Sequence, residues 1–170
     1  MTTGRTAARI AAALTALAAL AGCDPQRIDK LEEGVATEAD VRAQFGEPEN
    51  IWDSPAGRVL EYNRQPAGRK NYMITIGPDG RMSALRQVLT PENFARVQPG
   101  MPMEDLRKLL GKPAKVTRYA LKQETEWDWR WTQPPDTPMV FTAVLNDQQY
   151  VLRSGSVQDR SVEAPLAPAR

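Results

Sequence analysis

Residues 106–113 read LRKLLGKP, and residues 41–48 read VRAQFGEP. Both segments follow the pattern apolar-Arg-x-x-apolar-Gly-x-Pro, and at the same spacing residues 61–62 (EY) match residues 126–127 (EW). Self-similarity at a fixed spacing is the sequence signature of a repeated structural unit. The chain is therefore predicted to contain two copies of one unit.

The first copy is predicted to open with short helices. Thr37 followed by Asp40 matches a capping box, in which each residue satisfies a free backbone donor at the start of a helix. Gly46 and then Pro48 end that helix, because glycine adopts the left-handed cap and proline cannot continue the helix. Gly34 is interpreted as a structural turn before it.

The second copy is predicted to open in the same way. Thr90 stands before a proline, which favours a short helix from there to about Val97. The next helix ends at Gly111 and Pro113, the counterparts of the first copy's glycine and proline. Gly100 marks the turn between the two helices, as the counterpart of the earlier turn glycine.

Alternating apolar segments after the helices predict three strands in each copy, joined by turn residues such as Gly77-Pro78-Asp79-Gly80. The expected fold class is α+β, with two tandem α-α-β-β-β units whose helices pack on small three-stranded antiparallel sheets. The units are predicted at 29–89 and 90–154. The strands are expected at 59–63, 72–76 and 82–89, then at 125–132, 139–145 and 149–154.

The ends of the chain carry signals of another kind. Residues 1–22 combine two arginines, an Ala/Leu run and small residues before a cysteine, which is typical of a secretory signal peptide. Leu20-Ala21-Gly22-Cys23 matches the lipobox, so cleavage after Gly22 and lipidation of Cys23 are predicted; the alternative is a soluble periplasmic protein with a stray cysteine. Residues 23–28 are expected to form a tether, and 155–170 a disordered tail.

Charge and lipid together indicate the kind of partner. Removal of residues 1–22 takes away Arg5 and Arg9, which leaves 22 − 2 = 20 basic residues against 21 acidic residues. Without a basic stripe, the chain is not expected to bind nucleic acid. The lipid is expected to bind a membrane, because each buried methylene contributes about 0.8 kcal/mol. The other partners are expected to be proteins rather than a small-molecule substrate.

Catalysis is not expected of this chain. It has no histidine, and its one cysteine is assigned to the lipid, so the sequence offers no Ser/His or Cys/His nucleophile and no His- or Cys-based zinc site. Glu124, Glu126 and Asp128 lie on one face of a predicted strand, where an exposed polar face explains them better than an active site does. No metal or other cofactor is predicted.

Tryptophans occupy the opposite face of that strand. Trp127, Trp129 and Trp131 are interpreted as core residues that pack under the helices, with an interaction surface as the alternative. Trp52, in the loop expected after the first copy's helix, is the better candidate for an exposed aromatic residue in an interface.

Residues 97–106 (VQPGMPMEDL) and 110–113 (LGKP), followed by a Trp-rich strand and a hairpin, resemble the SmpA/OmlA (BamE-like) outer-membrane lipoproteins. The resemblance covers residues 94–153 well and the first copy more loosely. It implies two helices on a three-stranded sheet, and a role as an accessory scaffold in the β-barrel assembly machinery, with other subunits of that machinery as partners. Only Cys23 carries over as a functional residue.

Two features of the sequence each leave an alternative open, one for the function and one for the location. The two-unit layout is also similar to the β-lactamase inhibitor proteins, which implies a lipid-tethered module that binds or inhibits a periplasmic enzyme. The outer membrane is the expected location, with the protein facing the periplasm. Asp24 after the lipidated cysteine resembles the enterobacterial signal for the inner membrane, which is the second possibility.

Overall fold

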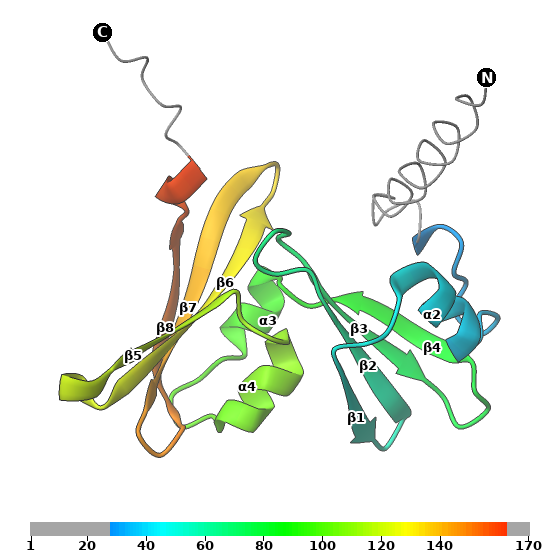
Figure 1. Ribbon diagram of the computed structural model, residues 1–170, viewed down its shortest axis with the longest axis horizontal. Helices are drawn as coiled ribbons and strands as arrows, with labels where there is room; N and C mark the ends of the chain where they lie inside the picture. The colour runs from blue at the N-terminus through cyan, green and yellow to red at the C-terminus, as the bar shows by residue number, and fades with distance from the viewer. Residues whose placement is uncertain (1–27, 163–170) are drawn as a thin grey trace, which may run out of the picture.

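The computed structural model describes residues 28–162, whose strands form two separate four-stranded antiparallel sheets (Figure 1). The strand order follows the chain in each sheet, so every connection is a hairpin. The first sheet contains β1 (Asn50–Ser54), β2 (Gly57–Asn63), β3 (Asn71–Ile76) and β4 (Met82–Gln87). The second contains β5 (Lys115–Tyr119), β6 (Glu124–Gln133), β7 (Thr137–Asn146) and β8 (Val151–Gln158).

The first unit packs one helix, α2 (Glu38–Phe45), on its sheet. The predicted capping box is confirmed, since Thr37 and Asp40 satisfy each other's backbone donors, and Gly46 caps the other end. Val41 and Phe45 are the buried residues of this helix, and the Phe45 ring lies 5.1 Å from that of Tyr62. Burial raises the pKa of Tyr62 to about 12, as expected for a phenol inside an apolar core.

The second unit packs two helices, α3 (Pro91–Ala95) and α4 (Met103–Leu110), on its sheet. Thr90 caps α3 by accepting from the Asn93 N–H, as predicted, and Gly111 ends α4. The core beneath them is aromatic: the ring of Phe94 stacks on Phe141 at 4.2 Å. The second unit therefore has a continuous core between its helices and its sheet.

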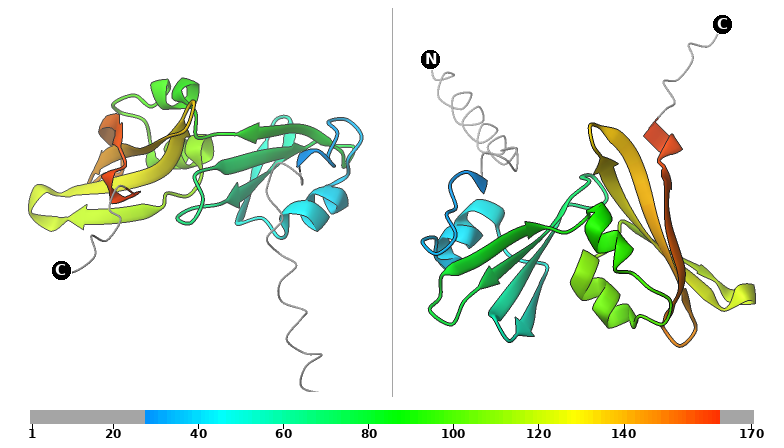
Figure 2. Two further views of the ribbon diagram at one scale, coloured as in Figure 1. Left: turned by 90° about the horizontal axis from the view of Figure 1, so that it is seen from above. Right: turned by 180° about the vertical axis from the view of Figure 1, so that it is seen from behind.

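The molecule is layered because the helices of the second unit lie between the two sheets (Figures 1 and 2). α2 covers one face of the first sheet, and the opposite face of that sheet meets α4. The second sheet carries α3 and α4 on one face, while its other face has no described element packed on it. The order of layers is α2, first sheet, α3 and α4, second sheet.

A buried ion pair joins the first sheet to α4. Glu61 of β2 is 0% exposed, and its carboxylate accepts hydrogen bonds from the Arg107 Nη2 atom at 3.0 and 3.1 Å. The same carboxylate accepts the Lys112 backbone N–H at 2.7 Å. Asn71 of β3 donates from Nδ2 to the carbonyls of Leu110 at 2.9 Å and of Lys112 at 3.1 Å. The first unit thus supplies partners for the C-terminal end of α4, which otherwise leaves backbone carbonyls unpaired.

A second set of contacts joins the units near the β2–β3 loop. The Gln65 side chain donates to the Arg130 carbonyl at 2.7 Å and accepts the Arg130 N–H at 3.1 Å. Asp159 is 5% exposed, and its carboxylate accepts hydrogen bonds from Arg69 of the first unit and from Arg130 of the second, both at 3.1 Å. Two separate regions therefore hold the units in one orientation.

The expected fold class is wrong, because the protein is mostly β: two four-stranded sheets with few helices replace the tandem α-α-β-β-β units. The sequence analysis placed Trp52 in a loop and predicted no strand at Asn50–Ser54 or at Lys115–Tyr119. β1 alternates between half-buried and exposed residues, and the ends of β5 are exposed on both faces. Both strands are held by backbone pairing with a longer neighbour, which leaves a weak hydrophobic pattern.

Two boundaries also differ from the expectation. The first unit has a turn region before α2, from Asp29 to Val35, where the analysis expected a further helix. β8 continues to Gln158 and is followed by a 3-10 turn at Arg160–Val162, so the predicted boundary at Ser154 falls inside a strand. Residues 155–158 fell in the segment 155–170, which was predicted to be disordered because it is rich in Ser, Pro and Ala.

We expect Glu61→Ala to lower the free energy of unfolding by about 3 kcal/mol, because it removes the acceptor for Arg107 and for the Lys112 N–H at a buried site. Urea denaturation followed by tryptophan fluorescence measures the change. Glu104→Ala, which removes an exposed partner of Lys108, is the control and should cost less than about 0.5 kcal/mol. Equal losses in the two variants would contradict the role assigned to Glu61.

We expect Asp159→Asn to weaken the pH dependence of stability. Burial raises the pKa of Asp159, but hydrogen bonds from Ser161 and Arg130 outweigh it and hold the pKa below its ordinary value. A lowered pKa stabilises the fold above the ordinary aspartate value of 3.8 and loses that contribution as the pH falls below it. Denaturation at about pH 6 and about pH 3 should show a smaller acid loss in the variant. An unchanged loss would assign the acid sensitivity to other carboxylates.

Candidate functional site

The tryptophan stripe of β6 faces α3 and α4. Trp129 is 0% exposed and Trp131 is 3% exposed, while Trp127 is half-buried against the same core. The Trp129 indole donates from Nε1 to the Gly111 carbonyl at 3.0 Å. The interpretation of these side chains as core is therefore confirmed for Trp129 and Trp131, and neither can anchor a partner on an exposed surface.

Trp52 lies at the junction of the two units. It stands in β1, where its side chain is half-buried and the Nζ atom of Lys108 from α4 lies 5.6 Å from its ring centroid. A cation over an indole face is attracted by the ring quadrupole. The expected exposed aromatic residue is thus a contact between the first sheet and α4, which could be found only once β1 was recognised as a strand.

The three carboxylates of β6 lie on the outer face of the second sheet, opposite the tryptophans. Glu124 pairs with Arg153 of β8 at 2.8 Å, and this hydrogen bond holds the pKa of Glu124 below its ordinary value. Glu126 accepts the Tyr119 hydroxyl at 3.1 Å, which raises the pKa of that phenol. Asp128 accepts the Thr142 hydroxyl at 2.6 Å. Each carboxylate has a separate partner, so no shared acid/base pair is formed.

The internal repeat allows the outer face of the second sheet to be compared with the equivalent face of the first sheet. Glu61 and Glu126 are equivalent by the repeat, and both lie on the face of their sheet that points away from that unit's own helices. In the first unit this face is covered by α4, and Glu61 binds Arg107 there. In the second unit the same face is open, and Glu126 has no ion pair within the described residues. The outer face, defined by Glu124, Glu126 and Asp128, is therefore the free counterpart of a surface that already binds a helix.

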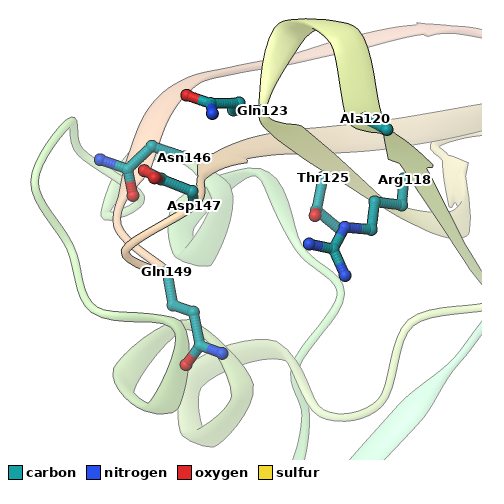
Figure 3. Close-up of a pocket in the computed structure, with 7 residues that line it drawn as sticks. All are labelled: Arg118, Ala120, Gln123, Thr125, Asn146, Asp147 and Gln149. Carbon is teal, nitrogen blue, oxygen red and sulfur yellow. The ribbon is translucent and has the colours of Figure 1, made fainter.

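A polar hollow of about 430 Å³ lies at one end of the second sheet (Figure 3). Arg118 and Thr125 lie side by side across β5 and β6, and the β7–β8 hairpin closes the other side. Asn146 accepts the Tyr150 N–H at 2.9 Å and so stabilises the hairpin itself. Asp147 is the only carboxylate among the seven lining residues, which are Arg118, Ala120, Gln123, Thr125, Asn146, Asp147 and Gln149. The hollow is therefore formed by the β7–β8 turn and by the facing ends of β5 and β6.

The remaining predicted site residues occupy turns or lie outside the described part of the chain. Gly34, Gly46 and Gly100 all have positive φ, as expected for turn and cap positions. At Gly111, φ is +76°, and a Cβ would come within 3.0 Å of the Asn71 side chain in the junction. This glycine is required by the contact between units as well as by the helix cap.

Two prolines and the lipidation site complete the set. Pro113 is buried and Pro48 half-buried, each just beyond the glycine that ends its helix. Gly22 and Cys23 lie outside the described residues, as does the predicted tether up to residue 27. Within residues 28–162, no helix is long and apolar enough to cross a membrane, and no cluster of acidic side chains is placed to hold a metal ion.

Comparisons with known proteins add one structural neighbour. No protein-family model and no curated protein matches the chain. Among solved structures, the chain is similar to a DUF4309 family protein, YjgB, from Bacillus subtilis, with 24% identity over 79% of this chain and 86% of that chain. The TM-score is 0.33, which is too low to carry an argument about fold or function.

We expect Trp129→Ala to destabilise the protein by about 3–5 kcal/mol, since it leaves a cavity in the core and removes the hydrogen bond to Gly111. Trp52→Ala should cost about 1 kcal/mol, because this ring is half-buried and contributes mainly its contact with Lys108. Thermal and urea unfolding of both variants measure the difference. Similar losses at the two positions would contradict the placement of Trp129 in the core and Trp52 at its margin.

Proposed function

We propose that this protein is a lipid-anchored, non-catalytic scaffold subunit of the bacterial envelope, which assists assembly of β-barrel proteins in the outer membrane. The lipobox ending at Cys23 supports the anchor. The resemblance to SmpA/OmlA lipoproteins supports the barrel-assembly role and names the partners as other subunits of that machinery. In this proposal the lipid holds the protein at the periplasmic face of the outer membrane.

The observation that carries the proposal is the open outer face of the second sheet. Its counterpart in the first unit already binds a helix layer through Glu61 and Arg107. An equivalent partner layer on the second sheet would be helical and would present an arginine or lysine to Glu126, which lacks an ion pair within the described residues. The two junctions between units hold this face in a constant orientation, as a scaffold requires.

The inhibitor-like alternative receives less support. It needed the β6 tryptophans as anchors for an enzyme, and two of them are buried in the core. The three carboxylates of the outer face suit a contact that depends on charge complementarity and orientation. We therefore retain the scaffold as the proposed function.

We expect the tagged, full-length lipoprotein, purified from detergent-solubilised envelopes, to recover barrel-assembly subunits. Glu126→Arg should reduce that recovery strongly, because it reverses the charge on the outer face. Glu32→Arg reverses an exposed charge on the first unit and is the matched control, while Cys23→Ser tests the lipid. Recovery of one abundant periplasmic enzyme in place of assembly subunits would overturn the proposal in favour of an inhibitor.

We expect deletion of the gene to lower the amounts of outer-membrane barrel proteins and to sensitise cells to detergent and vancomycin. The physical reason is that poorly assembled barrels leave defects in the permeability barrier. Complementation with the wild-type chain should restore both properties, and complementation with Glu126→Arg should not. Normal barrel levels and normal resistance in the deletion strain would count against the scaffold role.

A further inference from the structure

The outer edge of β8 is paired with residues 100–101 at Val151 and is free from Leu152 onward. The Gly100 N–H donates to the Val151 carbonyl at 2.7 Å, and the Val151 N–H donates to the Met101 carbonyl at 2.9 Å. The turn at residues 100–101 thus pairs with the start of this edge. From Leu152 to Gln158 every residue is exposed, and no described strand pairs with β8 on that side.

The register shows which backbone groups the free edge presents. In an antiparallel pair, hydrogen-bonded residue pairs alternate with non-hydrogen-bonded ones. The Asp159 N–H donates to the Pro138 carbonyl at 2.9 Å, so in the same register the backbone groups of Val157 and Gly155 point toward β7. Those of Ser154 and Ser156 therefore point outward, available to an added strand.

This edge lacks the usual protection against strand addition. Native edge strands are commonly short, or carry lysine, proline or several charges. β1 has five residues and β5 carries Lys115 and Arg118, whereas β8 has eight residues with no proline. Its one charged residue, Arg153, is paired with Glu124. The outer edge of β4 is already partly occupied, since the Gly34 N–H donates to the Met82 carbonyl at 2.7 Å and Glu33 accepts the Leu85 N–H at 2.9 Å. Of the four outer strands of the two sheets, β8 is therefore the one best suited to accept an extended peptide.

An apolar groove runs beside the free edge, on the side of the helices. It has a volume of about 530 Å³ and lies between α3 and β8, where Ser154, Gly155 and Ser156 leave space. Its apolar lining includes Phe94, Val97, Trp131 and Phe141. The Trp131 Nε1 atom is buried and has no hydrogen-bond partner within the described residues. Because this atom is inaccessible, the groove offers an occupant its apolar lining and not this donor.

We propose that β8 binds an extended strand of another envelope protein by β-augmentation, with the apolar side chains of that strand in the groove. The outward backbone groups of Ser154 and Ser156 require an extended backbone as the occupant, and pockets beside such an edge select alternate side chains. Residues facing the groove would be apolar, and those facing the outer side would be polar. This alternation is that of a barrel strand before insertion.

The identification of the strand as one from an unfolded barrel protein rests on the proposed function. Binding at β8 itself does not depend on it, because the edge and the groove are separate from the outer face around Glu126. The two proposals can therefore fail independently.

The test is fluorescence anisotropy with a labelled peptide of about ten residues, the length of a membrane-spanning strand, in which valine or phenylalanine alternates with threonine. A peptide of the same composition in scrambled order is the control. The full-length lipoprotein in detergent micelles is titrated into each peptide. We expect saturable binding of the alternating peptide, at least about ten-fold tighter than that of the scrambled one.

Two variants probe the edge and the groove without changing the core. Ser156→Pro removes an outward N–H that the fold does not use, and should weaken binding about ten-fold or more, whereas Ser156→Ala retains the N–H and should bind as the wild type. Ala95→Trp fills the groove from the exposed side of α3 and should have a similar effect to the proline, with Ala95→Ser as its control. Circular dichroism checks that each variant is folded.

Three outcomes would overturn the inference. If peptide binding is unchanged in both Ser156→Pro and Ala95→Trp, the binding site is not at β8 or its groove. If the alternating and scrambled peptides bind equally well, the protein does not select an extended amphipathic strand. Dimers that Ser156→Pro converts to monomers, without competition by the peptide, would assign the edge to a second copy of the chain. Recovery of assembly subunits in the co-purification alongside any of these outcomes would leave the scaffold role intact.

Discussion

The C-terminal end of α4 is the constraint on which the arrangement of both units depends. A helix end leaves backbone carbonyls without partners, and here those partners come from both sides. Asn71 of the first sheet binds the carbonyls of Leu110 and Lys112, and Trp129 of the second sheet binds that of Gly111. Glu61 completes the site with Arg107, so one short turn is bonded to both sheets.

The position of this turn explains why the first sheet is covered on both faces and the second sheet on one face only. α4 serves the core of the second unit on one side and the outer face of the first sheet on the other, so the first sheet is covered on both faces. The second sheet has helices on one face alone. Its outer face around Glu126 and the edge of β8 are the surfaces proposed to bind other molecules. One is a face of the second sheet and the other is its edge, so a partner on one does not block the other. Under the proposed function, a folded subunit binds the outer face while an extended strand binds β8, and the two sites are separate enough to be occupied at once.

Local signals in the sequence predicted part of this structure well. The capping pair Thr37 and Asp40 and the glycine at position 46 act within a few residues, so their pattern is sufficient to place α2. The alternation that put the β6 tryptophans on one face also held, because strand geometry alone determines it. β1 and β5 were missed because their stability comes from pairing with β2 and β6, which leaves little trace in their own side chains. The groove beside β8 was missed too, since Gly155 and Ser156 fall in the segment that was predicted to be a disordered tail.

Glu61 and Glu126 show most clearly where the sequence stops being informative. By itself the sequence determined the repeat, the helix caps, the face on which each residue of a strand lies, and the absence of histidine chemistry, because each depends on neighbouring residues or on composition. Both glutamates occupy the same position of the repeat, and nothing near them in the chain distinguishes them. Only the tertiary structure decided that Glu61 is the buried half of an ion pair and that Glu126 is a half-buried residue on an uncovered face. The physical reason is that burial depends on which distant element packs on a face. α4 packs on the face of the first sheet that carries Glu61, whereas no described element packs on the face of the second sheet that carries Glu126.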